Sequence, residues 1–536
     1  MATTLTAPTS QTVAHAGQAV SEPRFGLTLV TLLTAFALAV HGYHPYAEDG
    51  GIYLSGVKRL LNPSLYPHWS EFVTEHQRFS FFAPIIATIV RASHVPLMTV
   101  WFLLFVASFW LTLLAAWLLV TRCYVTREAR CAAVTLLAAW LTIPVAGTSL
   151  MLMDPYLSAR SFSTPCALFA LVGALDLFRP TTRHLSRNSG LALCLGSIAV
   201  AVILHPLMAA YALGCVLLLC CLLSRRNPIR MGGTAALCIL AVAIAAILYG
   251  TAPAATPEYT AVAMTRAYWF VGRWQWYEQF GLIGPLAILA AAGIYRRHTH
   301  GDAARALART GIVAGAVAIF VAALFARTAS SSFLVARLQP LRIFQVIYLL
   351  MILAIGAELG QRFLQRKMLR WAVSVALLAT ISWYTGFLTF PSSAHIEQPQ
   401  SEPTLQPRNQ WEQAFIWGRN NTPVDAVFAL DAHYVSLPGE DAQTFRAIAE
   451  RSALADYSKD GGEASITPDL TSAWLIGQAA QTGLNIATDA ARIAALRPLG
   501  VGWIILPSAS RTSFVCDYAN RAVKVCRLPG TNPPQR

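Results

Sequence analysis

The 536-residue chain is 55% hydrophobic and 12% charged, and that charged fraction is about half of what a soluble domain carries. The composition excludes a wholly water-soluble protein and predicts a polytopic α-helical membrane protein whose first partner is the lipid bilayer. The net charge of +14 does not indicate a nucleic-acid partner, because the arginines fall in short clusters between apolar runs instead of forming one basic face.

The chain begins with a polar segment rich in Ala, Thr and Ser, residues 1–24, which has no basic stretch ahead of a short apolar core. We therefore expect a disordered cytoplasmic tail, not a cleaved signal peptide. Residues 25–390 form the predicted transmembrane domain. About eleven apolar runs there are long enough to be membrane helices: 25–43, 97–120, 131–150, 162–178, 190–204, 206–223, 232–250, 279–295, 310–326, 341–360 and 371–390.

Every second loop between these runs is basic, which indicates cytoplasmic loops. The clusters are Arg122, Arg127 and Arg130; Arg179, Arg183 and Arg187; Arg225, Arg226 and Arg230; Arg296, Arg297, Arg305 and Arg309; and Arg362, Arg366, Lys367 and Arg370. All five share one side if the N-terminus is cytoplasmic, and residues after 390 are then extracytoplasmic. Counting 79–95 as a further span would invert this arrangement, so we expect an interfacial or re-entrant helix there.

The composition changes after the last run. Residues 391–408 are rich in Pro, Ser and Gln and predict a linker, and residues 409–536 are long enough for a small α/β domain. Its expected elements are helices at 411–420 and 442–455 and strands at 424–432, 502–507 and 521–526. An extracytoplasmic location makes a disulfide between Cys516 and Cys526 plausible.

Two adjacent acids, Glu48 and Asp49, follow the first predicted span and precede Gly50 and Gly51. Acids close to lipid are expensive and usually functional. A carboxylate here can serve as a general base or as a ligand to a divalent cation, and the glycines would let the backbone approach a ligand. The alternative is that Asp49 only caps a helix over 52–61.

A third acid, Asp154, lies in the second predicted outer loop, together with Arg160. An arginine suits a phosphate because its guanidinium is always charged and donates two parallel hydrogen bonds. The alternative is a salt bridge between Asp154 and Arg160 within the loop.

Further basic groups are expected on the same side: His76, Arg78, His205, Arg266, Arg337 and Arg342. They are candidates for contacts with a lipid phosphate, although for each one snorkelling to lipid headgroups is an alternative. The aromatic run 268–277 is typical of the interfacial belt, with a sugar or lipid platform as the functional alternative.

These features resemble the membrane glycosyltransferases of the GT-C fold, specifically an uncharacterised bacterial branch. The resemblance rests on the first-loop acids, on Asp154, and on the stretch from Arg337 to Pro340, which is similar to an Arg-Tyr-x-x-Pro signature. It also rests on residues 417–426, which open the soluble domain much as in oligosaccharyltransferase catalytic subunits. The peptide-binding Trp-Trp-Asp-Tyr-Gly motif of those subunits is absent.

The resemblance implies a multi-pass protein of the bacterial cytoplasmic membrane. Its donor would be a polyprenyl-phosphate-linked sugar, and its acceptor a glycan, lipid or protein at the outer face. Asp49, with Glu48 and Asp154, would be catalytic, and Asp49 and Asp154 would hold Mg²⁺ or Mn²⁺ if a metal is used. Arg337 would contact the lipid phosphate.

Our leading hypothesis is an inverting glycosyl transfer with Asp49 as the base. The alternative is a non-catalytic membrane protein with a GT-C-like scaffold that binds or moves a lipid-linked glycan. The leading hypothesis requires that Asp49 and Asp154 lie close together and that one of them faces a cavity.

Overall fold

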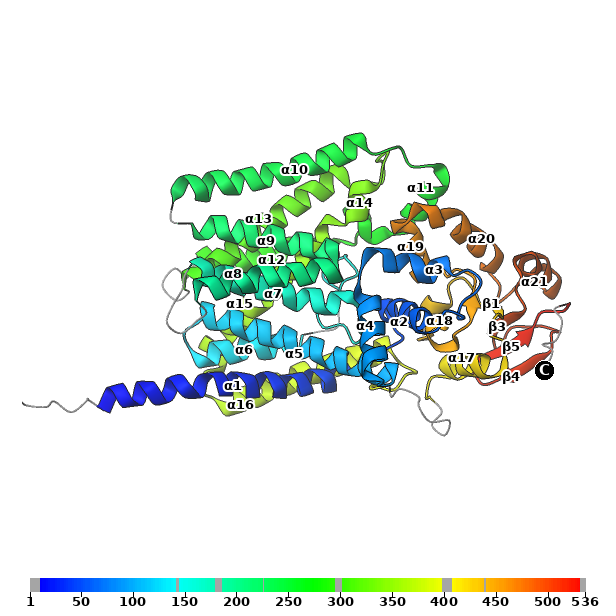
Figure 1. The fold of residues 1–536 in the computed structure, drawn as a ribbon, viewed down its shortest axis with the longest axis horizontal. Coiled ribbons are helices and arrows are strands. Elements are labelled where there is room, and N and C mark those ends of the chain that lie inside the picture. The colour runs from blue at the N-terminus through cyan, green and yellow to red at the C-terminus, as the bar shows by residue number, and fades with distance from the viewer. Residues whose placement is uncertain are drawn as a thin grey trace, which may run out of the picture.

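The computed structural model describes residues 10–140, 144–178, 186–224, 226–294, 301–397, 407–437 and 440–530. A bundle of long helices forms one part, and a smaller domain with a sheet covers one end of the bundle (Figure 1). The bundle helices are α1 (Ser10–His41), α5 (Leu97–Cys123), α6 (Arg127–Ala138), α7 (Ala159–Phe178), α8 (Arg187–Leu204), α9 (Pro206–Leu223), α10 (Thr234–Thr251), α12 (Trp276–Ile294), α13 (Asp302–Phe325), α15 (Phe344–Leu359) and α16 (Met368–Thr389).

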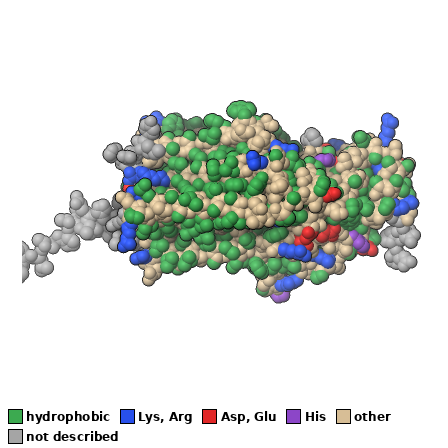
Figure 2. All heavy atoms as spheres, turned by 90° about the horizontal axis from the view of Figure 1, so that it is seen from above, with side chains coloured by type: hydrophobic (Ala, Val, Ile, Leu, Met, Phe, Trp, Pro, Cys, Tyr) green, Lys and Arg blue, Asp and Glu red, His purple; other side chains and the backbone are tan. Residues whose placement is uncertain are grey.

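Within the described residues, nine helical segments are long and apolar enough to cross a membrane. They match nine of the predicted spans and confirm a multi-pass membrane protein. Many of their apolar side chains face outward, as lipid-facing side chains do; α10 is the clearest case, with Ile239, Ile244 and Ile247 exposed. Figure 2 shows the resulting apolar belt, with Lys and Arg gathered at the end away from the small domain.

Two predicted spans take a different form. The run 279–295 is helix α12, which begins at Trp276 and has the polar residues Glu278 and Gln279 in its first turn. It is not among the nine helices that are long and apolar enough to cross a membrane. The run 131–150 is wrong as a full span, because α6 stops at Ala138. Residues 144–158 are irregular, with Ala146 and Ser149 in the left-handed region. Pro144 lacks a backbone N–H and cannot continue a helix, and irregular backbone at membrane depth is tolerated where it lines a cavity.

The N-terminal boundary also differs. Helix α1 starts at Ser10, so the backbone of residues 10–24, which the sequence predicts as part of a disordered tail, is helical. The segment contains Ala14, Ala16 and Ala19, and alanine is a strong helix former. Residues 1–9 lie outside the described residues.

Short helices cover the end of the bundle next to the C-terminal domain, which we call the outer end: α2 (Glu48–Leu61), α3 (Glu71–Thr74), α4 (Phe82–Ser93), α11 (Pro257–Met264) and α14 (Leu334–Leu338). Helix α4 falls in the stretch 79–95. Its 12 residues span about 18 Å, well short of the roughly 30 Å hydrocarbon core. One face is buried at Phe82 and Ile86, and the other is exposed at Ile85 and Ile89, which supports an interfacial helix.

The C-terminal domain contains α17 (Gln410–Asn421), α18 (Phe445–Ala449), α19 (Lys459–Ile466), α20 (Thr471–Gln481) and α21 (Asp489–Leu496). Its strands are β1 (Val427–Ala429), β2 (Ser452–Ala453), β3 (Trp503–Pro507), β4 (Cys516–Ala519) and β5 (Val523–Arg527). They form one sheet in the order β2-β1-β3-β5-β4, in which β1 is parallel to β2 and β3, and β5 is antiparallel to β3 and β4. The predicted small α/β domain is confirmed.

The structure decides two local predictions for this domain, a disulfide and a long helix. The predicted disulfide is present, since Cys516 and Cys526 are bonded across β4 and β5. The predicted helix 442–455 is wrong in its second half, because Glu450 adopts a left-handed conformation (φ 52°) that ends α18, and the chain then enters β2. Most of the predicted linker, residues 398–406, lies outside the described residues.

Buried polar contacts join the small domain to the bundle. The backbone of Tyr43 pairs with His395 and Glu397. The Glu397 carboxylate accepts hydrogen bonds from Gln443 at 2.6 Å and contacts His44 Nδ1 at 2.9 Å. The segment after α1 is therefore fixed against both the end of α16 and the C-terminal domain.

Close helix packing in the bundle depends on Gly173. A Cβ atom there would lie 2.5 Å from the Gly190 carbonyl oxygen and 2.6 Å from the Cys194 nitrogen on α8. We expect Gly173→Ala to separate α7 from α8 and to lower stability by about 1–3 kcal/mol, measured as thermal unfolding in detergent. Gly196→Ala is the control, because nothing lies within 4 Å of its added Cβ. Equal unfolding temperatures for both variants would contradict this packing.

Candidate functional site

A cavity of about 1150 Å³ lies between the outer ends of the bundle helices and the C-terminal domain. Its wall comes from segments far apart in sequence: the start of α2, the turn after α3, the irregular segment after α6, the α8–α9 junction, residues 265–274, α14 and α19. Ligand pockets of proteins are typically about 300–1000 Å³. The space is therefore sufficient for a small-molecule ligand.

The structure brings the sequence-predicted site residues to this cavity. Eight of them line it: Glu48, Asp49, His76, Arg78, Arg160, Arg266, Arg337 and Arg342. The exception is Asp154. Asp154 lies directly behind Arg160. His205, at the junction of α8 and α9, lines the cavity too.

Asp49 lies in the first turn of α2, where the positive end of the helix dipole favours a negative charge. Its neighbours Gly50 and Gly51 allow a close approach of protein segments. A Cβ on Gly51 would lie 2.2 Å from Thr444 Oγ1, and one on Gly50 would lie 3.0 Å from Tyr156 Cβ. The expectation that these glycines accommodate a ligand is therefore wrong, since they accommodate the C-terminal domain and the segment before α7.

The Arg160 guanidinium joins the two predicted acids. Its Nη1 donates to Asp49 Oδ2 at 3.2 Å, and its Nη2 donates to Asp154 Oδ2 at 3.0 Å. Only 4% of the Arg160 side chain and 7% of the Asp154 side chain is exposed, whereas Asp49 is 40% exposed toward the cavity. The salt bridge between Asp154 and Arg160 that the sequence left as an alternative is present, and it extends to Asp49.

The same charges set the ionisation of both acids. Burial acts to raise the pKa of Asp49, but the positive charges of Arg160, Lys459 and Arg342 outweigh it and lower the pKa to about 2. For Asp154, burial dominates over the attraction of Arg160 and raises the pKa. Asp49 is therefore an ionised carboxylate facing the cavity, and Asp154 supports it from behind.

Several predicted phosphate-binding residues are paired with protein groups. Arg266 donates to the carbonyl oxygens of Tyr457 and Ser458, each at 2.8 Å, and His76 Nδ1 contacts Glu463 Oε1 at 2.7 Å. Both contacts attach the segment containing α19 to the outer end of the bundle. Arg78, which is mostly exposed, pairs with Glu75.

Arg342 differs from these residues. Its side chain is half-buried, and it makes no hydrogen bond or ion pair with any part of the chain that the structure describes, while its Nε is buried without a partner. The turn before Arg342 sets the position of its backbone. Gln339 ends α14 in the left-handed region, and Pro340 starts the short helix that carries Arg342. A cationic group that lines a cavity and forms no ion pair is suited to an anionic ligand.

The sequence did not predict the contribution of the C-terminal domain. Lys459 forms an ion pair with Glu48, and Tyr457, Ser458 and Glu463 line the cavity. Of the aromatic run 268–277, Tyr268 and Trp274 line the cavity, whereas Trp276 and Tyr277 are exposed at the surface. No local pattern separates these roles, because they follow from how the domain folds back onto the bundle.

The residues near Asp49 do not fit the predicted metal site. Within the described residues, no group of three or more His, Cys, Asp or Glu side chains is placed to hold a metal ion. One oxygen of each acid, Oδ2 of Asp49 and Oδ2 of Asp154, accepts a hydrogen bond from Arg160, so a cation already lies between the two carboxylates.

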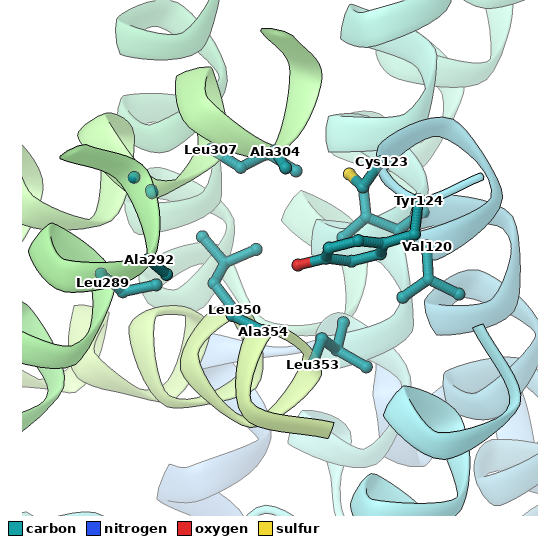
Figure 3. A pocket seen from close by; sticks show the side chains of 13 residues that line it. Val120, Cys123, Tyr124, Leu289, Ala292, Ala304, Leu307, Leu350, Leu353 and Ala354 are labelled. Atoms are coloured by element: carbon teal, nitrogen blue, oxygen red, sulfur yellow. The ribbon is translucent and has the colours of Figure 1, made fainter. Parts of the chain in front are cut away.

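A second cavity lies inside the bundle and is apolar. Figure 3 shows its lining side chains from α5, α12, α13 and α15, with Leu289, Leu307 and Leu350 among them. Its volume of about 30 Å³ is sufficient for one water molecule at most. It is a packing defect of the bundle, lined by apolar side chains together with Cys123 and Tyr124.

No protein-family model matches the chain, and no curated protein matches it. Among solved structures, the chain is similar to an archaeal oligosaccharyltransferase, AglB from Archaeoglobus fulgidus, solved in complex with an inhibitory peptide and a dolichol-phosphate. The similarity covers 91% of this chain and 70% of that chain, with a TM-score of 0.43 and 12% identity.

The His76–Glu463 contact gives a pH-dependent prediction. Burial acts to lower the pKa of His76, but the Glu463 and Asp49 carboxylates outweigh it and raise the pKa above its usual range. A raised pKa in the folded state means that protonated His76 stabilises the fold. This contribution is complete below about pH 6.5 and is lost as pH rises through the raised pKa.

We therefore expect His76→Gln to lower the thermal unfolding temperature at about pH 6, with a deficit relative to the unsubstituted protein that shrinks as pH rises. His68→Gln serves as the control, because His68 is exposed and does not line the cavity. A deficit that is constant with pH would show that His76 contributes through packing alone.

Proposed function

We propose that this chain is a membrane glycosyltransferase that moves a sugar from a polyprenyl-phosphate carrier to an acceptor at the outer face of a bacterial cytoplasmic membrane. The observation that carries the proposal is that a potential base and a potential anion-binding group line the same cavity. An ionised carboxylate, Asp49, and an unpaired guanidinium, Arg342, line it together. A base and an anion-binding group are the two elements that transfer from a lipid phosphate requires.

The lining supports a carrier that enters from the lipid side. Apolar residues Leu207, Leu334 and Leu338 form part of the wall beside Arg342, and a prenyl chain would lie against them while its phosphate contacts the arginine. Tyr268 and Trp274 offer aromatic faces of the kind that pack against sugar rings. The wall made by α19 is then left for the acceptor.

In the proposed reaction, Asp49 orients an acceptor hydroxyl toward the anomeric carbon of the sugar. The hydroxyl oxygen forms a bond to that carbon as the bond to the phosphate oxygen breaks. The lipid phosphate leaves with the electron pair, stabilised by Arg342, and the hydroxyl proton passes to Asp49. The attack from the opposite side inverts the configuration of the sugar.

A carboxylate with a pKa near 2 is a weak base, and the donor itself changes this. Arg342 is one of the charges that lower the pKa of Asp49. A bound phosphate would neutralise Arg342 and so weaken its pull on the carboxylate. Asp49 would then become more basic when the donor is in place, but only in part, because Arg160 and Lys459 lower its pKa more than Arg342 does.

The proposed orientation has the N-terminus in the cytoplasm and the C-terminal domain outside, so that the cavity faces the outer side. The five basic loops and the Cys516–Cys526 disulfide support it, since disulfides persist in oxidising compartments.

Glycan profiling tests the proposal. In a deletion strain, we expect the unsubstituted protein to restore a missing glycan, and Asp49→Asn to reduce the product on the order of 10²-fold or more. Asp425→Asn is a matched control, because this exposed acid of the C-terminal domain does not line the cavity. If Asp49→Asn restores the glycan as well as the control does, the chain is a non-catalytic scaffold for lipid-linked glycans.

Donor binding is tested separately with a long-chain polyprenyl phosphate and protein in nanodiscs. Arg342→Ala removes a charge-assisted contact and should weaken binding about 10- to 100-fold. Arg327→Ala is the control, because Arg327 is an exposed arginine beyond the end of α13 that does not line the cavity. Equal affinities for the two variants would remove Arg342 from the phosphate site.

A further inference from the structure

We propose that the Arg160 guanidinium is a built-in cation that takes the place of a divalent metal ion between Asp49 and Asp154. The inference deepens the proposed function, on which its catalytic meaning rests. It assigns Arg160 as a positioning residue and makes the site independent of divalent metal.

The geometry is that of a bridging cation. The two Nη atoms of one planar group contact one carboxylate each, at 3.2 and 3.0 Å. Asp49 comes from α2 and Asp154 from the irregular segment before α7, so the bridge joins two outer segments more than a hundred residues apart, as a metal ion shared by two loops would. Arginine suits this role because its fork of donors is rigid and its charge is permanent.

The surroundings explain why a cation is needed there. Two carboxylates within one buried site repel each other unless a positive charge lies between them. Asp154 Oδ1 is already buried without a hydrogen-bond partner in the described chain, so removing the remaining contact at Oδ2 would leave a buried carboxylate unsatisfied. That loss is strongly destabilising.

A metal ion does not fit beside Arg160. Divalent ions such as Mg²⁺ and Mn²⁺ prefer several oxygen ligands. Here, the inward oxygen of each acid already binds the guanidinium, and no third acid, histidine or cysteine joins them in a metal-binding cluster within the described residues. Arg160 thus performs two tasks of a metal, since it holds Asp49 in place and keeps the carboxylate ionised.

The test is a titration of the full-length protein in nanodiscs with Mn²⁺, in which electron paramagnetic resonance measures the free ion. The Mn²⁺ concentration is raised to ~1 mM, a range that includes weak carboxylate sites. We expect no saturable site in the unsubstituted protein. Arg160→Ser removes the guanidinium and should create one saturable site between the two acids. Adding Asp154→Asn to Arg160→Ser should abolish that site.

Two results would overturn the inference: a saturable Mn²⁺ site in the unsubstituted protein that Asp49→Asn removes, or a folded Arg160→Ser protein that binds no Mn²⁺. If Arg160→Ser does not fold, the test uses the unsubstituted protein and Arg160→Lys, which keeps a cation. A saturable Mn²⁺ site in either protein that Asp49→Asn removes would contradict a built-in cation. This titration does not depend on the glycan assay, so a failure of the proposed function and a failure of this inference are separate results.

Discussion

The buried guanidinium of Arg160 is the contact on which the outer half of this molecule depends. Arg160 lies in the first turn of α7. Its planar guanidinium binds Asp49 of α2 through one nitrogen and Asp154 of the preceding segment through another. Burying the Asp154 carboxylate without the cation would be costly, and the negative charge of Asp49 beside it would add to that cost. The same interaction that lets the acids lie together therefore determines which of them faces the cavity as an ionised group.

The C-terminal domain completes the site. Arg266 holds the backbone at Tyr457 and Ser458, and Lys459 pairs with Glu48, so that α19 forms a wall of the cavity. Gly51 permits the close approach of Thr444 from the same domain. The C-terminal domain is thus part of the cavity wall, and the cavity exists only because the two parts of the chain fold together.

The cavity also explains the main departure from the expected helices. A run as apolar as 131–150 is long enough to cross a membrane, yet residues 144–150 are irregular and place Ala146, Gly147 and Ser149 at the cavity. Gly147 has no side chain, and the Trp274 ring lies against its backbone, within 2.4 Å of where a Cβ would be. Hydropathy reports whether a segment is compatible with lipid, and it cannot report that a segment is withdrawn from lipid to line a polar space.

The sequence by itself determined the multi-pass architecture, the position of nearly every membrane helix, the α/β character of the C-terminal domain and many of the bundle side chains that line the cavity. These follow from apolar run length, from charge placement and from the cost of isolated acids near lipid. The tertiary structure alone decided their relations: that Arg160 binds two acids instead of a phosphate, that Arg342 is left unpaired, and that Lys459 and Tyr457 belong to the site. Each relation depends on distances between segments up to about 400 residues apart, and pairing across such separations is fixed by three-dimensional packing, which no local pattern encodes.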